Sequence, residues 1–153
     1  KLRPPLRSQA DIEALVNAIK DGTIDCLVSA HAPVSDEGKG VEYDVAPFGG
    51  SLLETTASAV LDVLHHKARL PLSRIVDAAS TRPAAIIGMT GRKGTLTPGA
   101  DGDVTILNIG TRVRVDSRQF LSKSHVCPLD GHQLLGGVAA TVIRGKVFDR
   151  GNV

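Results

Sequence analysis

The sequence contains few aromatic residues and few cysteines, and its net charge is small. Its 153 residues contain no tryptophan, one tyrosine, three phenylalanines and only two cysteines. Cys26 and Cys127 cannot build a disulfide framework, so we expect a reduced, cytoplasmic setting. The formal charge of +2 is small, and no basic stripe with interleaved aromatics occurs, which argues against a nucleic-acid partner.

Long hydrophobic runs are missing as well. The longest stretch without a charged residue, 131–143, has 13 positions, whereas a membrane-spanning helix needs about 18 or more. We therefore expect no membrane partner, and no signal-peptide pattern opens the chain. Lys1 comes first and Met89 is the single methionine, so we expect a piece or a processed product of a longer protein. At 153 residues the chain is too short for a complete (β/α)8 barrel, which takes about 250.

Up to Gly91, helical periodicity alternates with one strand pattern. Ser8 is an N-cap candidate, apolar residues then recur with helical spacing, and Gly22 ends the predicted helix. The short apolar run 24–30 predicts a buried strand, and helix, turn and strand in this order indicate an α/β unit. A loop rich in glycine and proline follows over 31–51. Further helices are predicted over 52–67, over 73–79 with Ser73 as N-cap, and from Pro83 to Gly88.

Beyond Gly91, glycine, proline and β-branched residues dominate. The patterns predict strands over 94–97, 103–109, 112–115, 138–143 and 146–148. Arg144 and Gly145 predict a hairpin turn between the last two strands. The residues alone thus indicate an α/β segment followed by a small antiparallel β module.

One histidine lies where α/β folds gather their reactive groups. His31 directly follows the predicted strand, and the carboxyl ends of parallel strands carry the sites of open sheets and barrels. Taken alone, a single histidine is more often a hydrogen-bonded structural residue than a ligand. The adjacent residues His65 and His66 cannot both coordinate one ion from the same helix. His125 and His132, which flank Cys127, do not have the spacing of zinc ligands. We interpret these four as structural residues.

Several short segments together resemble one known family. They cover nearly the whole chain in the family's order: Pro4–Ser8, Asp21–Cys26, His31–Pro33, Ala46–Gly49, Leu53–Thr55, Lys93–Asp101, Phe120–Ser124 and Pro128–Gly131. The combination resembles dihydroorotases, which are zinc-dependent members of the amidohydrolase superfamily. Hydantoinases and allantoinase share parts of it.

The resemblance implies a fold and an activity. It places residues 1–90 at the end of a (β/α)8 barrel and residues 91–153 in the accessory β module of the amidohydrolase fold. The family belongs to de novo pyrimidine biosynthesis and converts N-carbamoyl-aspartate to dihydroorotate by cyclic amide chemistry at zinc. Its other metal ligands belong to earlier strands and have no counterpart in this chain.

The chain departs from the family pattern at three positions near the expected pocket. Ala30 stands where the family has an aspartate that binds metal and transfers protons, and Val34 where it has a histidine for the substrate carboxylate. Arg3 often corresponds to an asparagine. An alanine methyl has no lone pair, so it can neither bind zinc nor take a proton from water. The resemblance leaves His31, Gly49 and Arg3 as substrate-binding residues, with no catalytic residue and no metal ligand in this chain.

Three functions follow as expectations. The first is a non-catalytic dihydroorotase homologue that scaffolds aspartate carbamoyltransferase and forms a homo-oligomer at full length. The second is an active zinc dihydroorotase in which a carboxylate of the same loop substitutes, from Asp36, Glu37 or Asp44. The third is a fragment without function, whose unpaired strand edge would favour aggregation.

Overall fold

The helical part of the chain begins with α1 (Gln9–Asp21), where the sequence predicts a helix. In the computed structural model, which describes residues 1–149, Ser8 caps α1 in a reciprocal capping box with Asp11, and Gly22 ends it in the left-handed conformation. Only Ile19 of its apolar face is fully buried, while Leu15 of the same face stays 49% exposed. The predicted helix is therefore confirmed, although half of its apolar face is left open.

The longest helical stretch runs from Leu53 to Lys67. It joins a 3-10 turn η1 (Leu53–Thr55), α3 (Thr56–Val60) and a π-helical segment η2 (Leu61–Lys67) without a break in helical backbone. Its inner side chains meet those of α1 and of the following helix in one hydrophobic core, made by Ile19, Leu64, Leu70 and Ile75. This stretch confirms the helix predicted over 52–67.

The helices predicted over 73–79 and from Pro83 to Gly88 form one continuous helical stretch. α4 (Leu72–Val76), the π-helical η3 (Asp77–Thr81) and α5 (Arg82–Ile86) follow one another with helical backbone throughout. The N-cap is Pro71, so the placement of Ser73 at that position is wrong. Proline in the first turn of α5 does not interrupt the helix, because the wider hydrogen-bond pattern of η3 precedes it.

The segment 24–30 forms no strand among the described residues, which corrects the prediction. Leu27 donates its N–H to the carbonyl of Ala78, and Arg74 donates to the carbonyls of Ile19 and Ile24 at 2.7 and 3.0 Å. The segment is thus tied to helices, whereas a strand needs a ladder of bonds to a neighbouring strand. Nor does a strand form at 94–97, where the backbone turns.

A three-stranded antiparallel sheet makes up the C-terminal part. β1 (Val104–Arg114) pairs with β2 (Gln133–Ile143), and β2 pairs with β3 (Lys146–Asp149). The hairpin between β2 and β3 turns at Arg144 and Gly145, which both have positive φ, as the sequence predicts. The strands predicted over 103–109 and 112–115 are joined in β1, and a short 3-10 turn η4 (Ser117–Gln119) follows.

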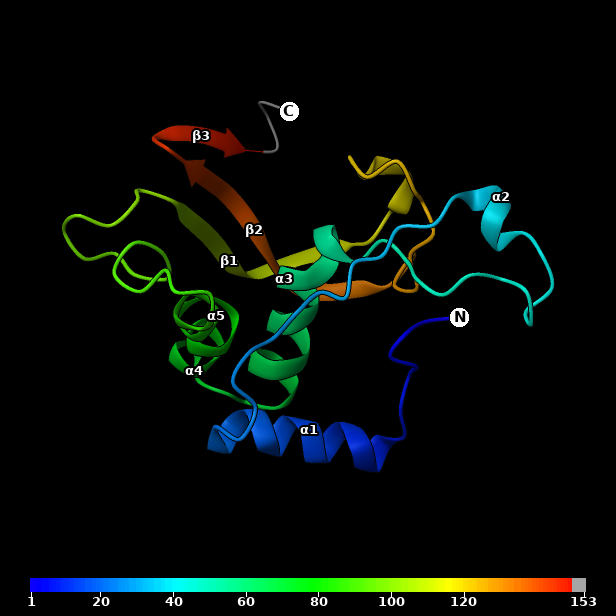
Figure 1. Ribbon diagram of the computed structural model, residues 1–153, viewed down its shortest axis with the longest axis horizontal. Coiled ribbons are helices and arrows are strands. Elements are labelled where there is room, and N and C mark those ends of the chain that lie inside the picture. The colour runs from blue at the N-terminus through cyan, green and yellow to red at the C-terminus, as the bar shows by residue number, and fades with distance from the viewer. Residues whose placement is uncertain (150–153) are drawn as a thin grey trace.

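The long helical stretch packs against β2, and this contact joins the two parts of the chain (Figure 1). Gly136 makes the close approach possible, because a Cβ added there would lie 2.7 Å from Cβ of Leu61. Its φ of +103 also favours glycine. The side chain of Asp62 is only 8% exposed. It accepts a hydrogen bond from the Leu135 N–H at 3.2 Å and forms an ion pair with Lys67 Nζ at 2.5 Å.

None of the described helices is both long and apolar enough to span a membrane. The division at residues 90 and 91 stays a prediction, and the last four residues of the predicted β module, 150–153, lie outside the described residues.

Candidate functional site

Three segments that are distant in sequence lie side by side where the resemblance predicts the substrate site. Ala32 pairs with Gly50 in an isolated antiparallel bridge, and its N–H donates to the Gly50 carbonyl at 3.1 Å. On the other side, Gly49 donates its N–H to the carbonyl of Lys1 at 3.1 Å. The structure therefore brings Arg3, His31 and Gly49, the three predicted substrate-binding residues, onto neighbouring segments.

Gly49 lies at a position that only glycine fits. Its φ is +131, and a Cβ added there would lie 2.3 Å from the carbonyl oxygen of Ala32. The same Cβ would lie 3.1 Å from a methyl of Val34, so the valine packs over the glycine. The resemblance implies that Gly49 binds substrate, but in this conformation its N–H donates to the Lys1 carbonyl.

Ala30 lies at the end of the extended segment with a left-handed backbone, φ +51. This conformation costs an alanine about 1–2 kcal/mol, whereas aspartate and asparagine adopt it more readily. The alanine side chain brings no hydrogen-bonding atom to this position. Position 30 at the end of the segment thus has a left-handed backbone and a side chain that cannot carry a proton.

His31 is held by the start of the long helical stretch. Its Nδ1 accepts the backbone N–H groups of Leu52 and Leu53, both at 3.1 Å. Because Nδ1 accepts twice, the proton of the neutral ring belongs on Nε2. His31 is consequently a positioned Nε2–H donor whose orientation is fixed by two backbone bonds.

A group of cations covers the aromatic ring of Phe48 next to Gly49. The Arg3 guanidinium carbon lies 4.7 Å from the ring centroid, and Lys1 Nζ lies 4.8 Å from it. Lys39 Nζ donates to the carbonyls of Lys1 and Pro47, at 2.8 Å each. These bonds fasten the first residues of the chain to the glycine-rich loop.

Residues that the sequence analysis missed connect this loop to the segment 121–126. Both carboxylate oxygens of Glu54 accept backbone N–H groups, from Leu121 and Ser122, at 3.0 Å each. Ser124 donates from Oγ to the carbonyl of Val34 at 2.6 Å, and buried Ser51 donates from Oγ to the carbonyl of Ser124 at 2.9 Å. Glu54, Leu121, Ser122 and Ser124 lie in motifs that the resemblance singles out, but the motifs do not identify their hydrogen-bond partners, and Ser51 lies outside them.

The carboxylates that could substitute at the site lie in the same loop. A short helix α2 (Asp36–Lys39), capped by Ser35, carries Asp36 and Glu37 in its first turn. These two residues and Asp44 are exposed, and within residues 1–149 no hydrogen bond or ion pair joins their side chains to His31.

The other histidines bond to backbone carbonyls. His65 Nδ1 lies 3.0 Å from the carbonyl oxygen of Leu70, and His66 Nε2 lies 2.8 Å from that of Ile109. His125 Nδ1 lies 2.8 Å from the Ser117 carbonyl oxygen, and burial raises the pKa of the neighbouring Cys127 thiol. Hydrogen bonds of this kind fit the structural interpretation.

The residues at the end of the extended segment 24–30 do not fit a metal ion. Ala30 offers no ligand atom, and His31 uses Nδ1 for two backbone bonds. Across the part of the chain that the structure describes, three or more histidine, cysteine or acidic side chains do not gather as a metal site would require. We therefore derive no chemical step through zinc from these residues.

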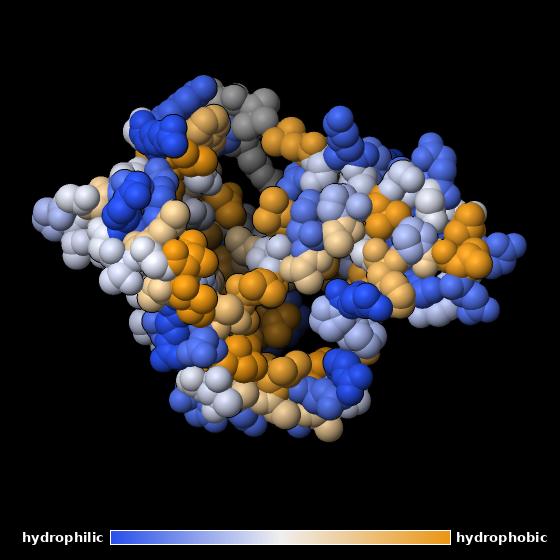
Figure 2. Space-filling model, in the orientation of Figure 1, coloured by the Kyte–Doolittle hydropathy of each residue, from blue (hydrophilic) through white to orange (hydrophobic). Residues whose placement is uncertain are grey.

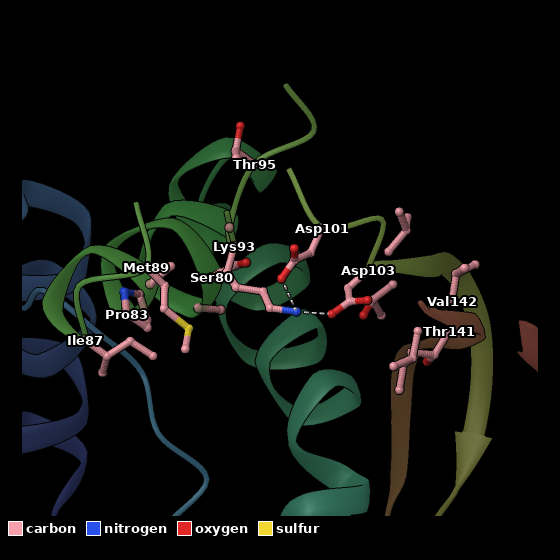
Figure 3. A pocket seen from close by; sticks show the side chains of 16 residues that line it. Ser80, Pro83, Ile87, Met89, Lys93, Thr95, Asp101, Asp103, Thr141 and Val142 are labelled. Carbon is pink, nitrogen blue, oxygen red and sulfur yellow. Dashed lines mark hydrogen bonds and ion pairs between the residues drawn. The ribbon is translucent and has the colours of Figure 1, made fainter. Parts of the chain in front are cut away.

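Two hollows lie away from this site. One, of about 490 Å³, lies between α5 and the sheet, and in it the Lys93 ammonium points between Asp101 and Asp103 (Figure 3). The hydrogen bond from Lys93 is the main reason why the pKa of Asp103 lies below its ordinary value. The other, of about 560 Å³, is lined by β1, β2 and the turn at 119–121.

Hydrophobic side chains also remain on the surface. Figure 2 shows them gathered along the rim of a central hollow, between α1 and the sheet. The exposed large hydrophobic residues of the helices include Leu15, Val76 and Ile86, and Ile87 directly after α5 is exposed as well. An exposed apolar area of this kind is typical of an interaction surface.

The comparisons with known proteins agree with this geometry. Residues 34–149 match the family described as "Amidohydrolase family". The chain is 40% identical over 147 residues to a putative dihydroorotase of Rhodopirellula baltica, covering 96% of this chain and 32% of that protein. It is 35% identical over 153 residues to the dihydroorotase of Acetivibrio thermocellus, covering all of this chain and 35% of that one. The chain thus spans about a third of the length of these relatives.

Solved structures show the same architecture. The L-hydantoinase of Arthrobacter aurescens superposes with a TM-score of 0.90 at 34% identity, over 96% of this chain and 33% of that one. The D-hydantoinase of Thermus sp. superposes with a TM-score of 0.89 at 27% identity, over 99% and 34%. These likenesses confirm the prediction of an α/β chain that forms the end of an amidohydrolase barrel followed by a small antiparallel β module.

Proposed function

Since this chain belongs to the amidohydrolase family, we propose that it is part of a dihydroorotase-type protein that binds its pyrimidine-ring ligand but does not hydrolyse it. The observation that carries the proposal is Ala30 at the tip of the extended segment. General acid–base help contributes about 10²–10⁴-fold to a rate, which corresponds to roughly 3–5 kcal/mol of barrier. A methyl group at this tip supplies none of it.

The neighbouring residues keep features that serve binding. His31 presents a fixed Nε2–H that can donate to a carbonyl oxygen of a ring ligand. Gly49 keeps the loop close to Ala32, which shapes the wall of the site. The chain thus retains donors and shape where it lacks the group that would accept a proton from water.

The biological role that we propose is structural. A dihydroorotase homologue without hydrolytic activity would hold aspartate carbamoyltransferase in an assembly, as a cytoplasmic homo-oligomer at full length. The support for this role is the resemblance together with the substitution at Ala30. Co-purification of the full-length protein with the transferase tests it, and two proteins that elute separately would refute it.

The absence of hydrolysis has a direct test. The full-length protein, loaded with zinc, is mixed with dihydroorotate or N-carbamoyl-aspartate, and ring opening and closure are followed by absorbance or chromatography. We expect no turnover above a buffer blank. The double variant Ala30→Asp/Val34→His is expected to gain activity, whereas Ala32→Asp, two residues further on, should gain none.

Turnover by the unmodified protein would refute the proposal. In that case single variants Asp36→Asn, Glu37→Gln and Asp44→Asn would show which carboxylate of the loop substitutes for the missing one.

A further inference from the structure

The guanidinium of Arg3 is stacked on a ring but has no hydrogen bond or ion pair within residues 1–149. Its carbon lies 4.7 Å from the Phe48 centroid, and the side chain is exposed. Stacking on an aromatic ring restricts the plane of a guanidinium without using its N–H groups. Arg3 therefore keeps its donors available and oriented.

The two neighbouring lysines are used differently. Lys1 Nζ donates to two loop carbonyls at 3.0 and 2.8 Å, and Lys39 Nζ donates to two more at 2.8 Å each. These bonds hold the loop in shape and engage both ammonium groups with backbone carbonyls. Among the described cations of this cluster, Arg3 is the one whose side chain donates no hydrogen bond, whereas each lysine ammonium uses two of its three donors.

The position of Arg3 links it to the substrate site. Phe48, its platform, directly precedes Gly49, whose N–H bonds to Lys1 two residues before Arg3. On the other side of the glycine, the methyl groups of Val34 offer no donor. A negatively charged ligand in this place would find its cationic partner in Arg3.

We propose that Arg3, with Phe48 as its platform, recognises the carboxylate of the ligand and selects carboxylated pyrimidine rings over uncharged ones. This inference rests on the proposed function, because it takes a pyrimidine-ring ligand as its starting point. A guanidinium binds a carboxylate through two parallel N–H···O bonds, which a lysine ammonium cannot reproduce. Arg3 thereby supplies the charge that Val34 cannot.

Calorimetric titration of the full-length protein with orotate and with uracil tests the inference. These two rings differ only in the carboxylate, and their unsaturated ring resists hydrolysis, so binding is measured without turnover. We expect orotate to bind at least about tenfold more tightly than uracil at low salt, and the preference to shrink as salt rises. Arg3→Gln should abolish the preference, and Phe48→Leu should reduce it.

Two further variants make the result specific. Arg3→Lys keeps the charge and is expected to retain only part of the preference. Arg7→Gln removes a nearby arginine that pairs with Asp11 on the surface at 3.4 Å, and it should leave the preference unchanged. Equal preference in the Arg3→Gln and unmodified proteins would overturn the inference, and so would an unmodified protein that binds both rings equally or neither.

This outcome is distinguishable from failure of the proposed function. Hydrolysis of dihydroorotate would refute the proposed function while leaving the role of Arg3 in binding to be read from the orotate preference.

Discussion

Replacing Glu54 with alanine is expected to loosen the segment 121–122 from the helix that begins beside the site. Both oxygens of the Glu54 carboxylate are used, by the N–H groups of Leu121 and Ser122 at 3.0 Å each. All three residues lie near solvent, so each bond contributes a net of about 0.5–1.5 kcal/mol. The local stability lost is therefore about 1–3 kcal/mol. Because 1.4 kcal/mol corresponds to tenfold, amide exchange at both residues should become roughly 5- to 150-fold faster.

Hydrogen–deuterium exchange followed by mass spectrometry measures this effect locally. Peptides that cover 118–126 report on the released segment, and peptides from β1 serve as an internal reference. Glu42→Ala is the matched control, since Glu42 is an exposed glutamate whose side chain has no hydrogen bond or ion pair among the described residues. Unchanged exchange at 121–122 in Glu54→Ala, or an equal increase in Glu42→Ala, would refute the reasoning.

Three further predictions concern stability, measured by chemical denaturation. Ala30→Gly relieves the cost of φ +51 and should stabilise the protein by up to about 1 kcal/mol, while Ala32→Gly should destabilise it. Gly49→Ala should cost about 2–4 kcal/mol, and more than Gly99→Ala, which shares the positive φ but has open space around it. Burial alone would raise the pKa of Asp62. The hydrogen bonds from Lys67 and from the Leu135 N–H lower the pKa by more than burial raises it, so it lies below the ordinary 3.8. Asp62→Asn should therefore cost about 1–2 kcal/mol at neutral pH, and the difference should vanish as the pH falls through the lowered pKa, where the native aspartate loses its charge.

Local chemistry made the helix ends predictable. Ser8 and Asp11 satisfy each other's backbone groups three residues apart, and Gly22 ends the same helix, so a short window contains everything that α1 needs. The hairpin at Arg144 and Gly145 is equally local. The helices after Pro71 were less predictable, because the pattern alone does not reveal that η3 continues one helix into the next.

Contacts between distant residues were beyond prediction from the residues alone. The segment 24–30 has the composition of a strand, but a strand also needs a partner, and the described residues offer helices instead. Glu54 and Leu121 are 67 positions apart, and no spacing rule connects them. The resemblance identified both motifs as important, yet only the structure shows that one binds the other. For the same reason the tautomer of His31 depends on Leu52 and Leu53, 21 and 22 positions away.

The tip of the extended segment keeps a shape that its present side chain does not favour. Ala30 has φ +51, at a cost of about 1–2 kcal/mol, where an aspartate would lie more comfortably. The neighbours explain why the strain persists: the ring of His31 is held by two backbone N–H groups, and Gly49 lies too close to Ala32 for the loop to shift. These contacts from both sides hold the backbone of position 30 in its left-handed shape without a carboxylate there. Under the proposed function, binding depends on this shape and hydrolysis on a carboxylate at position 30, and Ala30→Asp is a substitution that a backbone with φ +51 accommodates.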